Sequence, residues 1–248
     1  MLSKDHPLVF TRPFRKVHHT ASGVSIIGGG RDSRPGEISL AHKGVLFLDE
    51  FLEFDGKLLE MLRQPLEDGE ISINRVNASY TYPAKFVLIG ALNPCPCGFL
   101  GDKEKSCICS ESQIERYRSK LSGPILDRID LFIRVPRIKI EDFAEHKKTS
   151  KTSEELKNQI EQARVFGRKR FSGTKKTYNA EMGNEDTEKF CILGEKEDIF
   201  IKSAMERLSL STRIYFRILK LARTIADLEG SENIQLPHLA EALSYRKV

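Results

Sequence analysis

Residues 45–50 read Val-Leu-Phe-Leu-Asp-Glu, a short apolar run that stops at two carboxylates. Glycine, serine and arginine dominate residues 20–37 ahead of it, and that composition is typical of loops. A continuous apolar run of this length, preceded by turn signals, is typical of a strand buried on both faces of a parallel sheet. We therefore predict an α/β domain with a central strand that ends at Asp49 and Glu50.

The residues that follow alternate between helix and strand patterns. Leucines at helical spacing predict a helix over 55–67, and residues 71–82 are patterned as a β-hairpin with a polar tip. Two more apolar runs, 86–89 and 131–135, predict further buried strands, and a helix is expected over 111–121. This order indicates a parallel sheet with hairpin insertions.

Beyond the third predicted strand the chain becomes highly charged and then helical in pattern. The clearest helix covers 212–228, where apolar residues recur at steps of four and three, and Pro237 begins a last helix. We therefore divide the chain into an α/β part, residues 1–136, and an all-helical part, residues 137–248.

Composition and charge are those of an ordinary soluble protein. The 248 residues are 40% hydrophobic and 30% charged, and no apolar run approaches the roughly 20 residues needed to cross a bilayer. The amino-terminal residues lack the apolar stretch of a secretion signal, so we expect a cytoplasmic protein without a membrane partner. A net charge of +5 is compatible with a nucleic-acid partner and equally with a merely soluble surface.

Four of the five cysteines lie close together in the sequence, at Cys95, Cys97, Cys107 and Cys109. In a reducing cytosol such clustering favours metal binding over disulfides. Four thiolates satisfy a tetrahedral structural zinc ion and leave no open position for catalysis. The C-x-C spacing is less usual than C-x-x-C, so reduced thiols without a metal, and then disulfides, remain alternatives.

Polar residues at the ends of predicted strands are candidate catalytic groups. An apolar strand that ends in Asp-Glu is the Walker B pattern, in which Asp49 would order magnesium on a nucleotide and Glu50 would polarise the attacking water. Asn93 follows the next strand at the same kind of position, and open α/β sheets bind ligands at the carboxyl ends of their strands. Taken singly, each of these residues also fits a solvated turn.

The order and spacing of these features resemble the magnesium-chelatase-like family of AAA+ ring ATPases, in particular its ComM/YifB branch. The resemblance runs over almost the whole chain, with two departures at Val17 and Leu52, where the family usually has proline. The stretches that carry it are RPFRKVHHT (12–20), IGGG (27–30), RPGEISLAHKGVLFLDEF (34–51), LRQPLEDGEISINR (62–75), YPAKFVLIGALNPCPCG (82–98), LSGPILDRIDLFIRVP (121–136) and LARTIADLEG (221–230).

This resemblance implies an ATP-driven ring with Mg²⁺ as cofactor and active sites shared between subunits. It implies that Asn93 senses the γ-phosphate (sensor 1). Arg128 would be the arginine finger that reaches the neighbouring subunit's nucleotide. Arg213, or Arg217 one turn later, would contact the nucleotide from a lid domain (sensor 2). From the residues alone, Arg128 fits better a surface arginine paired with Asp127 or Asp130. Arg213 and Arg217 likewise fit exposed charges on an amphipathic helix.

The hairpin over 71–82 and the glycine-rich segment over 22–42 resemble insertions that point into the central pore of related motors. Arg75, Arg31 and Arg34 are therefore candidates for contacts with nucleic-acid phosphates. Solvated loops are an equal alternative for both segments.

The family's phosphate-binding loop, G-x-x-x-x-G-K-[ST] (Walker A), has no counterpart in these residues. Gly28–Gly30 is followed by no Gly-Lys-Ser/Thr, and Gly56-Lys57 is followed by Leu58. Because that loop supplies most of the phosphate cradle, we expect the chain alone to hydrolyse no ATP. We interpret it as part of a longer or split protein.

We therefore expect this chain to be part of a self-assembling ATPase motor. The resemblance implies that the motor is a hexamer and acts on DNA, in branch migration during natural transformation. One alternative is a subunit that drives magnesium into a porphyrin. Another is a non-catalytic, zinc-bearing interaction module.

Overall fold

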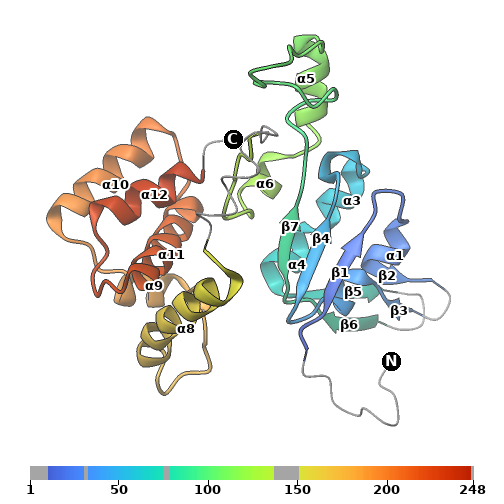
Figure 1. Ribbon diagram of the computed structural model, residues 1–248. Coiled ribbons are helices and arrows are strands. Elements are labelled where there is room, and N and C mark those ends of the chain that lie inside the picture. The colour runs from blue at the N-terminus through green and yellow to red at the C-terminus, as the bar shows by residue number, and fades with distance from the viewer. Residues whose placement is uncertain (1–10, 31–32, 75–78, 137–150, 247–248) are drawn as a thin grey trace. The chain divides into compact units, whose positions relative to one another are not determined.

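The computed structural model describes residues 11–30, 33–74, 79–136 and 151–246. The chain divides into two compact units, Met1–Arg128 and Ile129–Val248. The first unit combines strands with short helices, and the described residues of the second contain helices and no strand (Figure 1). The predicted α/β core with hairpin insertions, followed by a helical part, is confirmed.

A parallel three-stranded sheet forms the centre of the first unit. Its strands are β1 (Phe14–Val17), β4 (Val45–Leu48) and β7 (Val87–Gly90), in the order β1-β4-β7. Both neighbours of β4 are parallel to it, and Leu46 and Leu48 are fully buried. The apolar run that opened the sequence analysis is therefore the central strand, as predicted.

The strand β7 is much less buried than its sequence predicts. Val87 is 59% exposed and Ile89 is 44% exposed, because β7 lies at the edge of the sheet in the described part of the chain. Parallel sheets are normally covered on both faces, so this apolar edge is an unusual feature.

The prediction of a third strand over residues 131–135 is wrong. These residues form no regular element, and Ile133 and Val135 are largely exposed. A strand needs a neighbour that exchanges backbone hydrogen bonds with it. The amide of Phe132 instead donates to the carbonyl oxygen of Tyr245 at 2.8 Å, in the last turn of the helical unit. Apolar character alone therefore did not make this segment a strand.

The glycine-rich segment that was predicted as a loop contains short regular elements. They are α1 (Gly23–Ile27), the two-residue strands β2 (Gly28–Gly29) and β3 (Arg34–Pro35), and α2 (Glu37–Leu40). Ser22 begins α1 because its Oγ accepts a hydrogen bond from the amide of Ser25 at 3.2 Å. Gly28 has φ 106°, and a Cβ there would lie 2.6 Å from the carbonyl oxygen of Arg34, so the β2–β3 pairing needs glycine.

The predicted helix and hairpin after β4 are both present. The helix is divided into α3 (Gly56–Met61) and α4 (Arg63–Asp68), and Gly69 ends it in a left-handed conformation. The antiparallel hairpin consists of β5 (Glu70–Asn74) and β6 (Ser79–Pro83). The remaining elements of the first unit are η1 (Phe51–Glu53), α5 (Glu111–Arg118) and α6 (Gly123–Leu126).

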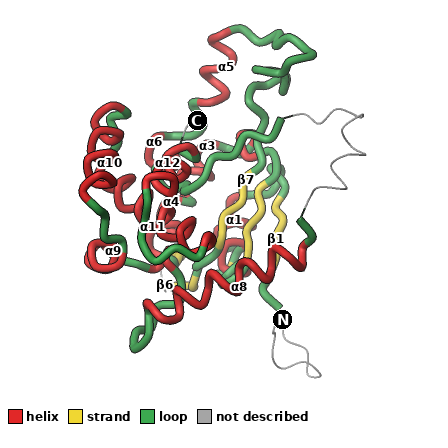
Figure 2. Tube along the Cα trace, turned by 60° about the vertical axis from the view of Figure 1, so that its left-hand side comes forward, coloured by secondary structure: helices red, strands yellow, loops and turns green. Residues whose placement is uncertain are grey.

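Helix α11 (Thr212–Glu229) is the centre of the second unit. Its residues Ile214, Ile218 and Ile225 are buried in that unit's core, and α11 packs against α12 (Leu236–Ser244) and α8 (Ser153–Arg170). Figure 2 shows these helices in red. The predicted helices over 212–228 and from Pro237 are confirmed. The others are η2 (Asn179–Glu181), α9 (Asn184–Phe190) and α10 (Glu195–Arg207). None of the described helices combines the length and apolar character needed to span a bilayer.

A buried ion network joins α8 to α11. Asp227 accepts from Arg170 Nη2 at 2.6 Å and from Arg223 Nε at 3.1 Å, and all three side chains are at most 10% exposed. Removing one member of a buried network leaves the remaining charges without compensation, which typically costs about 3–5 kcal/mol.

We therefore expect Asp227→Ala to lower the free energy of unfolding of the helical unit by about 3 kcal/mol. Urea unfolding of the full chain, followed by far-UV circular dichroism, measures this. The matched control is Asp198→Ala, which removes an exposed pair with Lys202 and should leave the free energy of unfolding nearly unchanged. Equal losses in the two variants would show that the network adds nothing to stability.

Candidate active site and cysteine cluster

The ends of β4 and β7 bring three predicted catalytic residues to one edge of the sheet. Leu48 on β4 pairs with Gly90 on β7, so both strands end at the same level of the sheet. Asp49 and Glu50 follow β4, and Asn93 follows β7. The backbone contact continues past the strands, since the amide of Ala91 donates to the carbonyl oxygen of Leu48 at 3.0 Å. The catalytic roles of these residues remain predictions.

A lysine that the sequence did not single out accompanies Asp49. Lys16, on β1, places its Nζ 3.1 Å from Asp49 Oδ2. This hydrogen bond is the largest cause of the lowered pKa of Asp49, so its carboxylate stays ionised over a wider pH range. Lys16 was missed because β1 itself was not predicted, since the basic residues Arg15 and Lys16 interrupt its apolar pattern.

Glu50 has a left-handed backbone, with φ 51° and ψ 48°, although it is not glycine. Such conformations cost about 1–3 kcal/mol and concentrate at functional sites. Its Oε2 lies 2.6 Å from His19 Nδ1.

The two adjacent histidines lie together, with ring centroids 4.2 Å apart. Two adjacent side chains on a strand would point to opposite faces of the sheet. Here β1 ends at Val17, so His18 and His19 follow the strand and their rings can meet, with planes tilted by 34°.

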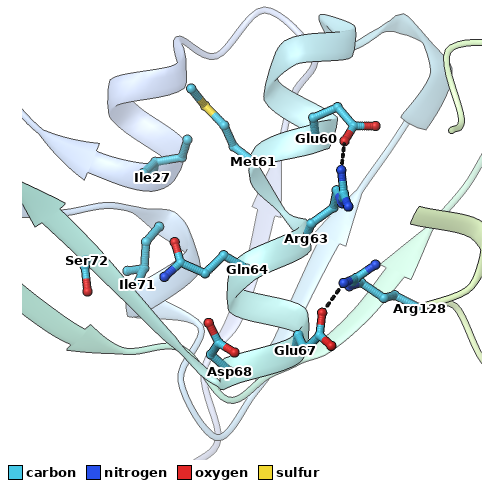
Figure 3. A pocket seen from close by; sticks show the side chains of 10 residues that line it. All are labelled: Ile27, Glu60, Met61, Arg63, Gln64, Glu67, Asp68, Ile71, Ser72 and Arg128. Atoms are coloured by element: carbon cyan, nitrogen blue, oxygen red, sulfur yellow. Dashed lines mark hydrogen bonds and ion pairs between the residues drawn. The ribbon is translucent and has the colours of Figure 1, made fainter. Parts of the chain in front are cut away.

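The predicted arginine finger lies against its own unit. The Arg128 side chain is only 7% exposed, its guanidinium contacts the carboxylate of Glu67, and its Nη1 donates to the carbonyl oxygen of Pro124 at 2.7 Å. Figure 3 shows Arg128 pointing at Glu67 on α4, beside a second charge pair formed by Arg63 and Glu60. Both pairs line a cleft of about 560 Å³ that is completed by Ile27, Met61, Gln64, Asp68, Ile71 and Ser72.

The remaining predicted arginines lie in other elements of the chain, or outside its described residues. Arg34 is exposed on β3, whereas Arg31 and Arg75 lie outside the described residues. Arg213 is exposed in the first turn of α11, and Arg217 Nη1 lies 2.5 Å from Asp130 Oδ1 within the second unit. Their nucleotide or nucleic-acid contacts therefore remain predictions.

The four clustered cysteines converge on one point. The Cys95 sulfur lies 3.4 Å from that of Cys97 and 3.6 Å from that of Cys107, and all four sulfurs, including Cys109, lie within 4.8 Å of one another. Tetrahedral Zn²⁺ with bonds of about 2.3 Å holds its sulfurs about 3.8 Å apart. These residues fit that ion in number, chemistry and spacing.

The backbone around Cys97 favours the thiolate form that a metal requires. The amides of Phe99 and Ile108 hydrogen-bond to its sulfur and lower its pKa to about 6. Burial and hydrogen bonds with the neighbouring sulfurs act in the opposite direction on Cys107 and raise its pKa to about 12, so without a metal the cluster shares its protons unevenly. Cys95 is fully buried, while the other three are partly exposed at the loop surface. The cluster therefore lies where a metal ion would serve as a small core for the segment between β7 and α5.

Sequence profiles of known families match both parts of the chain. The profile described as "Magnesium chelatase, subunit ChlI" covers residues 1–143, and the one described as "Magnesium chelatase, subunit ChlI C-terminal" covers residues 150–246. The chain belongs to the magnesium-chelatase-like family.

Relatives of this magnesium-chelatase-like chain include ComM and YifB proteins, which confirms the predicted resemblance. Competence protein ComM from Haemophilus influenzae is 45% identical over 236 residues, which cover 95% of the chain and 45% of that relative. YifB from Escherichia coli is 40% identical over 238 residues, 96% of the chain and 46% of the relative. The magnesium-chelatase 38 kDa subunit of Acidiphilium rubrum is 34% identical over 70 residues, 28% of the chain and 20% of that protein. The chain thus spans about half the length of the ComM and YifB relatives it matches.

Proposed function

We propose that this chain carries the hydrolytic half of an ATP-driven AAA+ ring motor. The observation that carries the proposal is the convergence of Asp49, Glu50 and Asn93 at neighbouring strand ends in a magnesium-chelatase-like protein. Asp49 binds the Mg²⁺ of the nucleotide, Glu50 polarises the attacking water, and Asn93 contacts the γ-phosphate. The magnesium ion neutralises charge that develops on the phosphates during transfer.

The site is completed by other subunits and by the helical part. Arg128 serves the nucleotide of the adjacent subunit, and residues 137–248 form a lid from which Arg213, or Arg217, contacts the nucleotide. The motor assembles with itself as a ring, and a hexamer is the number we propose. In the single subunit Arg128 pairs with Glu67. When the ring assembles, Arg128 has to leave this carboxylate and contact a phosphate of the neighbouring subunit's nucleotide.

The phosphate-binding loop comes from protein outside these 248 residues. Two observations support this: no Gly-Lys-Ser/Thr loop occurs in the sequence, and no strand of the described residues pairs with the exposed edge of the apolar strand β7. A strand that leads into a phosphate-binding loop would pair with β7, cover Val87 and Ile89, and bring the loop beside Asp49.

We expect ATP hydrolysis to appear when the chain is co-expressed with the phosphate-binding-loop segment of a ComM relative, and to be absent from either part alone. Purified complexes are assayed for phosphate release. The matched control is the same complex with Glu50→Gln, which should bind ATP without hydrolysing it. Any phosphate that this variant releases comes from a contaminating ATPase. A stable complex without hydrolysis would favour the non-catalytic interaction module.

DNA is the substrate that we propose for the motor. The similarity to a protein named for competence, the net charge of +5 and the exposed Arg34 beside the β2–β3 pairing support it. A magnesium chelatase subunit is the second candidate, supported by the family profiles and the short match to the 38 kDa subunit. Stimulation of the reconstituted ATPase by DNA, and not by a porphyrin with its partner subunits, would separate the two.

We also propose that Cys95, Cys97, Cys107 and Cys109 hold one structural Zn²⁺ ion. Their sulfur spacing and the thiolate-stabilising backbone around Cys97 support it. Four protein thiolates fill a tetrahedral site, so the ion stabilises the loop and takes no part in hydrolysis.

A further inference from the structure

We infer that the cysteine cluster is a positioning device for Asn93: a metal ion held by the four clustered cysteines fixes the place of this asparagine at the edge of the sheet. The inference rests on the proposed Zn²⁺ site and, for its effect on hydrolysis, on the proposed ATPase function. The ion itself only cross-links the loop. Neither the family profiles nor the relatives' names assign the cluster such a role.

Asn93 is poorly held by its own surroundings. Backbone pairing with the neighbouring strand stops before it, since the last such hydrogen bonds join Ala91 to Leu48 at 3.0 Å and Phe51 to Ala91 at 2.8 Å. The Asn93 side chain is exposed, and it makes no hydrogen bond within the described residues. A side chain that contacts a reacting phosphate has to be held in the right place. The position of Asn93 therefore has to come from the chain that follows it.

A stiff link joins Asn93 to the cluster. Only Pro94 separates Asn93 from Cys95, whose side chain is fully buried. The proline ring fixes its own φ, and it also restricts the residue before it to extended conformations. Fixing the Cys95 sulfur therefore restricts the backbone of Asn93 as well, because few free torsions lie between the two residues.

The cysteine loop also folds back onto the Asn93 side chain. The amide of Gly98 donates to the carbonyl oxygen of Cys95 at 3.0 Å, which closes a tight turn, and Gly98 has φ 80°. A Cβ on Gly98 would lie 4.0 Å from Asn93 Oδ1, so this turn passes directly beside the asparagine. Cys97 is part of the turn, so a metal ion on its sulfur holds the turn in place.

The far end of the loop returns to the same edge of the sheet. Tyr117 on α5 is buried, and its hydroxyl donates to the carboxylate of Glu53, in the segment that follows Glu50. Lys120 Nζ donates to the carbonyl oxygen of Leu52 at 2.6 Å. The loop therefore begins at one candidate catalytic strand end and closes against the other.

The loop has almost no core of its own. Residues 91–120 are all described, and only Cys95 and Tyr117 among them are buried. Ordering a loop of this length costs chain entropy, and two buried side chains offset little of that cost. The four sulfurs lie within 4.8 Å of one another, so one ion cross-links the start of the loop to the residues just before α5. Without the ion, the loop and with it Asn93 should sample many positions.

The first test follows the Asn93 side-chain amide by NMR in the 248-residue chain labelled with ¹⁵N-asparagine. Removing zinc with a chelator should shift and broaden this signal, and adding zinc back should restore it. The signal of Asn179, which donates to Asp227 in the helical unit, should not change. An Asn93 signal that is the same with and without zinc would overturn the inference, and so would a chain that binds no zinc.

A proline variant keeps the metal and loosens only the link. Pro94→Ala leaves all four ligands in place, so metal analysis should find the wild-type zinc content while the Asn93 signal broadens. Pro96→Ala is the matched control, because it makes the same change between Cys95 and Cys97, on the far side of the ligand from Asn93. It should leave the Asn93 signal unchanged. A Pro94→Ala chain with full zinc and the wild-type Asn93 signal would contradict the link.

The second test uses the ring reconstituted with the phosphate-binding segment, from which zinc is removed before Mg²⁺ and ATP are added. Zinc removal, and Pro94→Ala with zinc bound, should each lower kcat about 10–100-fold with the KM for ATP nearly unchanged, because small displacements of a positioned group cost this much. Pro96→Ala should stay close to the wild type. An unchanged kcat in the zinc-free ring, or a loss confined to KM, would contradict the role.

These measurements separate the inference from the two proposals on which it rests. If the wild-type ring hydrolyses no ATP, the proposed ATPase function fails, and the NMR result still decides whether the cluster holds Asn93. If the chain contains no zinc, the metal site and this inference fail together, whatever the activity of the ring. If the ring is active, binds zinc and keeps its kcat after zinc removal, only the positioning role fails.

Discussion

Replacing Arg128 with alanine should lower kcat for ATP hydrolysis at least about a thousandfold in a ring completed by the phosphate-binding segment. An arginine that stabilises the charge on the transferred phosphoryl group acts mainly in the transition state, so nucleotide affinity should change little. Steady-state kinetics and equilibrium nucleotide binding on the same preparation measure both quantities.

A mixing experiment shows whether Arg128 acts across the subunit boundary. Rings made from equal amounts of Arg128→Ala and Glu50→Gln subunits contain some sites with an intact Glu50 and an intact Arg128 from the neighbour. Such mixed rings should regain activity that neither variant has alone. If mixing restores nothing, Arg128 acts within its own subunit, as its contact with Glu67 would then indicate.

The contact with Glu67 makes a structural role for Arg128 the main competing explanation. A variant that merely loosens α6 would also lose activity, but it would unfold more easily and would not complement in mixed rings. Arg63→Ala is the matched control, because Arg63 lines the same cleft and pairs with Glu60 in the same way. It should retain hydrolysis within a few fold.

Purified chain should contain about one zinc ion, and the double variant Cys95→Ser/Cys107→Ser should contain none. Two thiolates cannot hold a closed structural site, and binding and folding of such sites are coupled. Metal analysis by mass spectrometry gives the stoichiometry. Cobalt substitution adds an independent readout, since tetrahedral thiolate ligation gives intense charge-transfer absorption.

The remaining cysteine supplies the control for the zinc prediction. Cys191 is 4% exposed in the core of the helical unit, and burial raises its pKa to about 11, so it should be inert. Cys191→Ser should keep its full zinc content. A wild-type chain free of zinc after purification without chelators would exclude the metal and leave four reduced thiols.

Local sequence patterns were sufficient for much of the fold. The apolar run of β4, the leucine spacing of α3 and α4, and the stripe on α11 each depend on contacts that repeat along one element. The short strand β1 and the helix α1 were missed. Two basic residues interrupt the apolar pattern of β1, and α1 lies in a segment whose glycines and serines are typical of loops.

What the sequence by itself determined was the set of chemical groups: an acidic pair after a buried strand, an asparagine after the next strand, and four thiols in one loop. The tertiary structure alone decided which of these groups meet and what else joins them. The contacts of His19 with Glu50, Lys16 with Asp49 and Arg128 with Glu67 join separate elements, and no local pattern encodes them. The same reason explains why two apolar segments differ: β7 has a partner strand in β4, whereas residues 131–135 have none within the described chain.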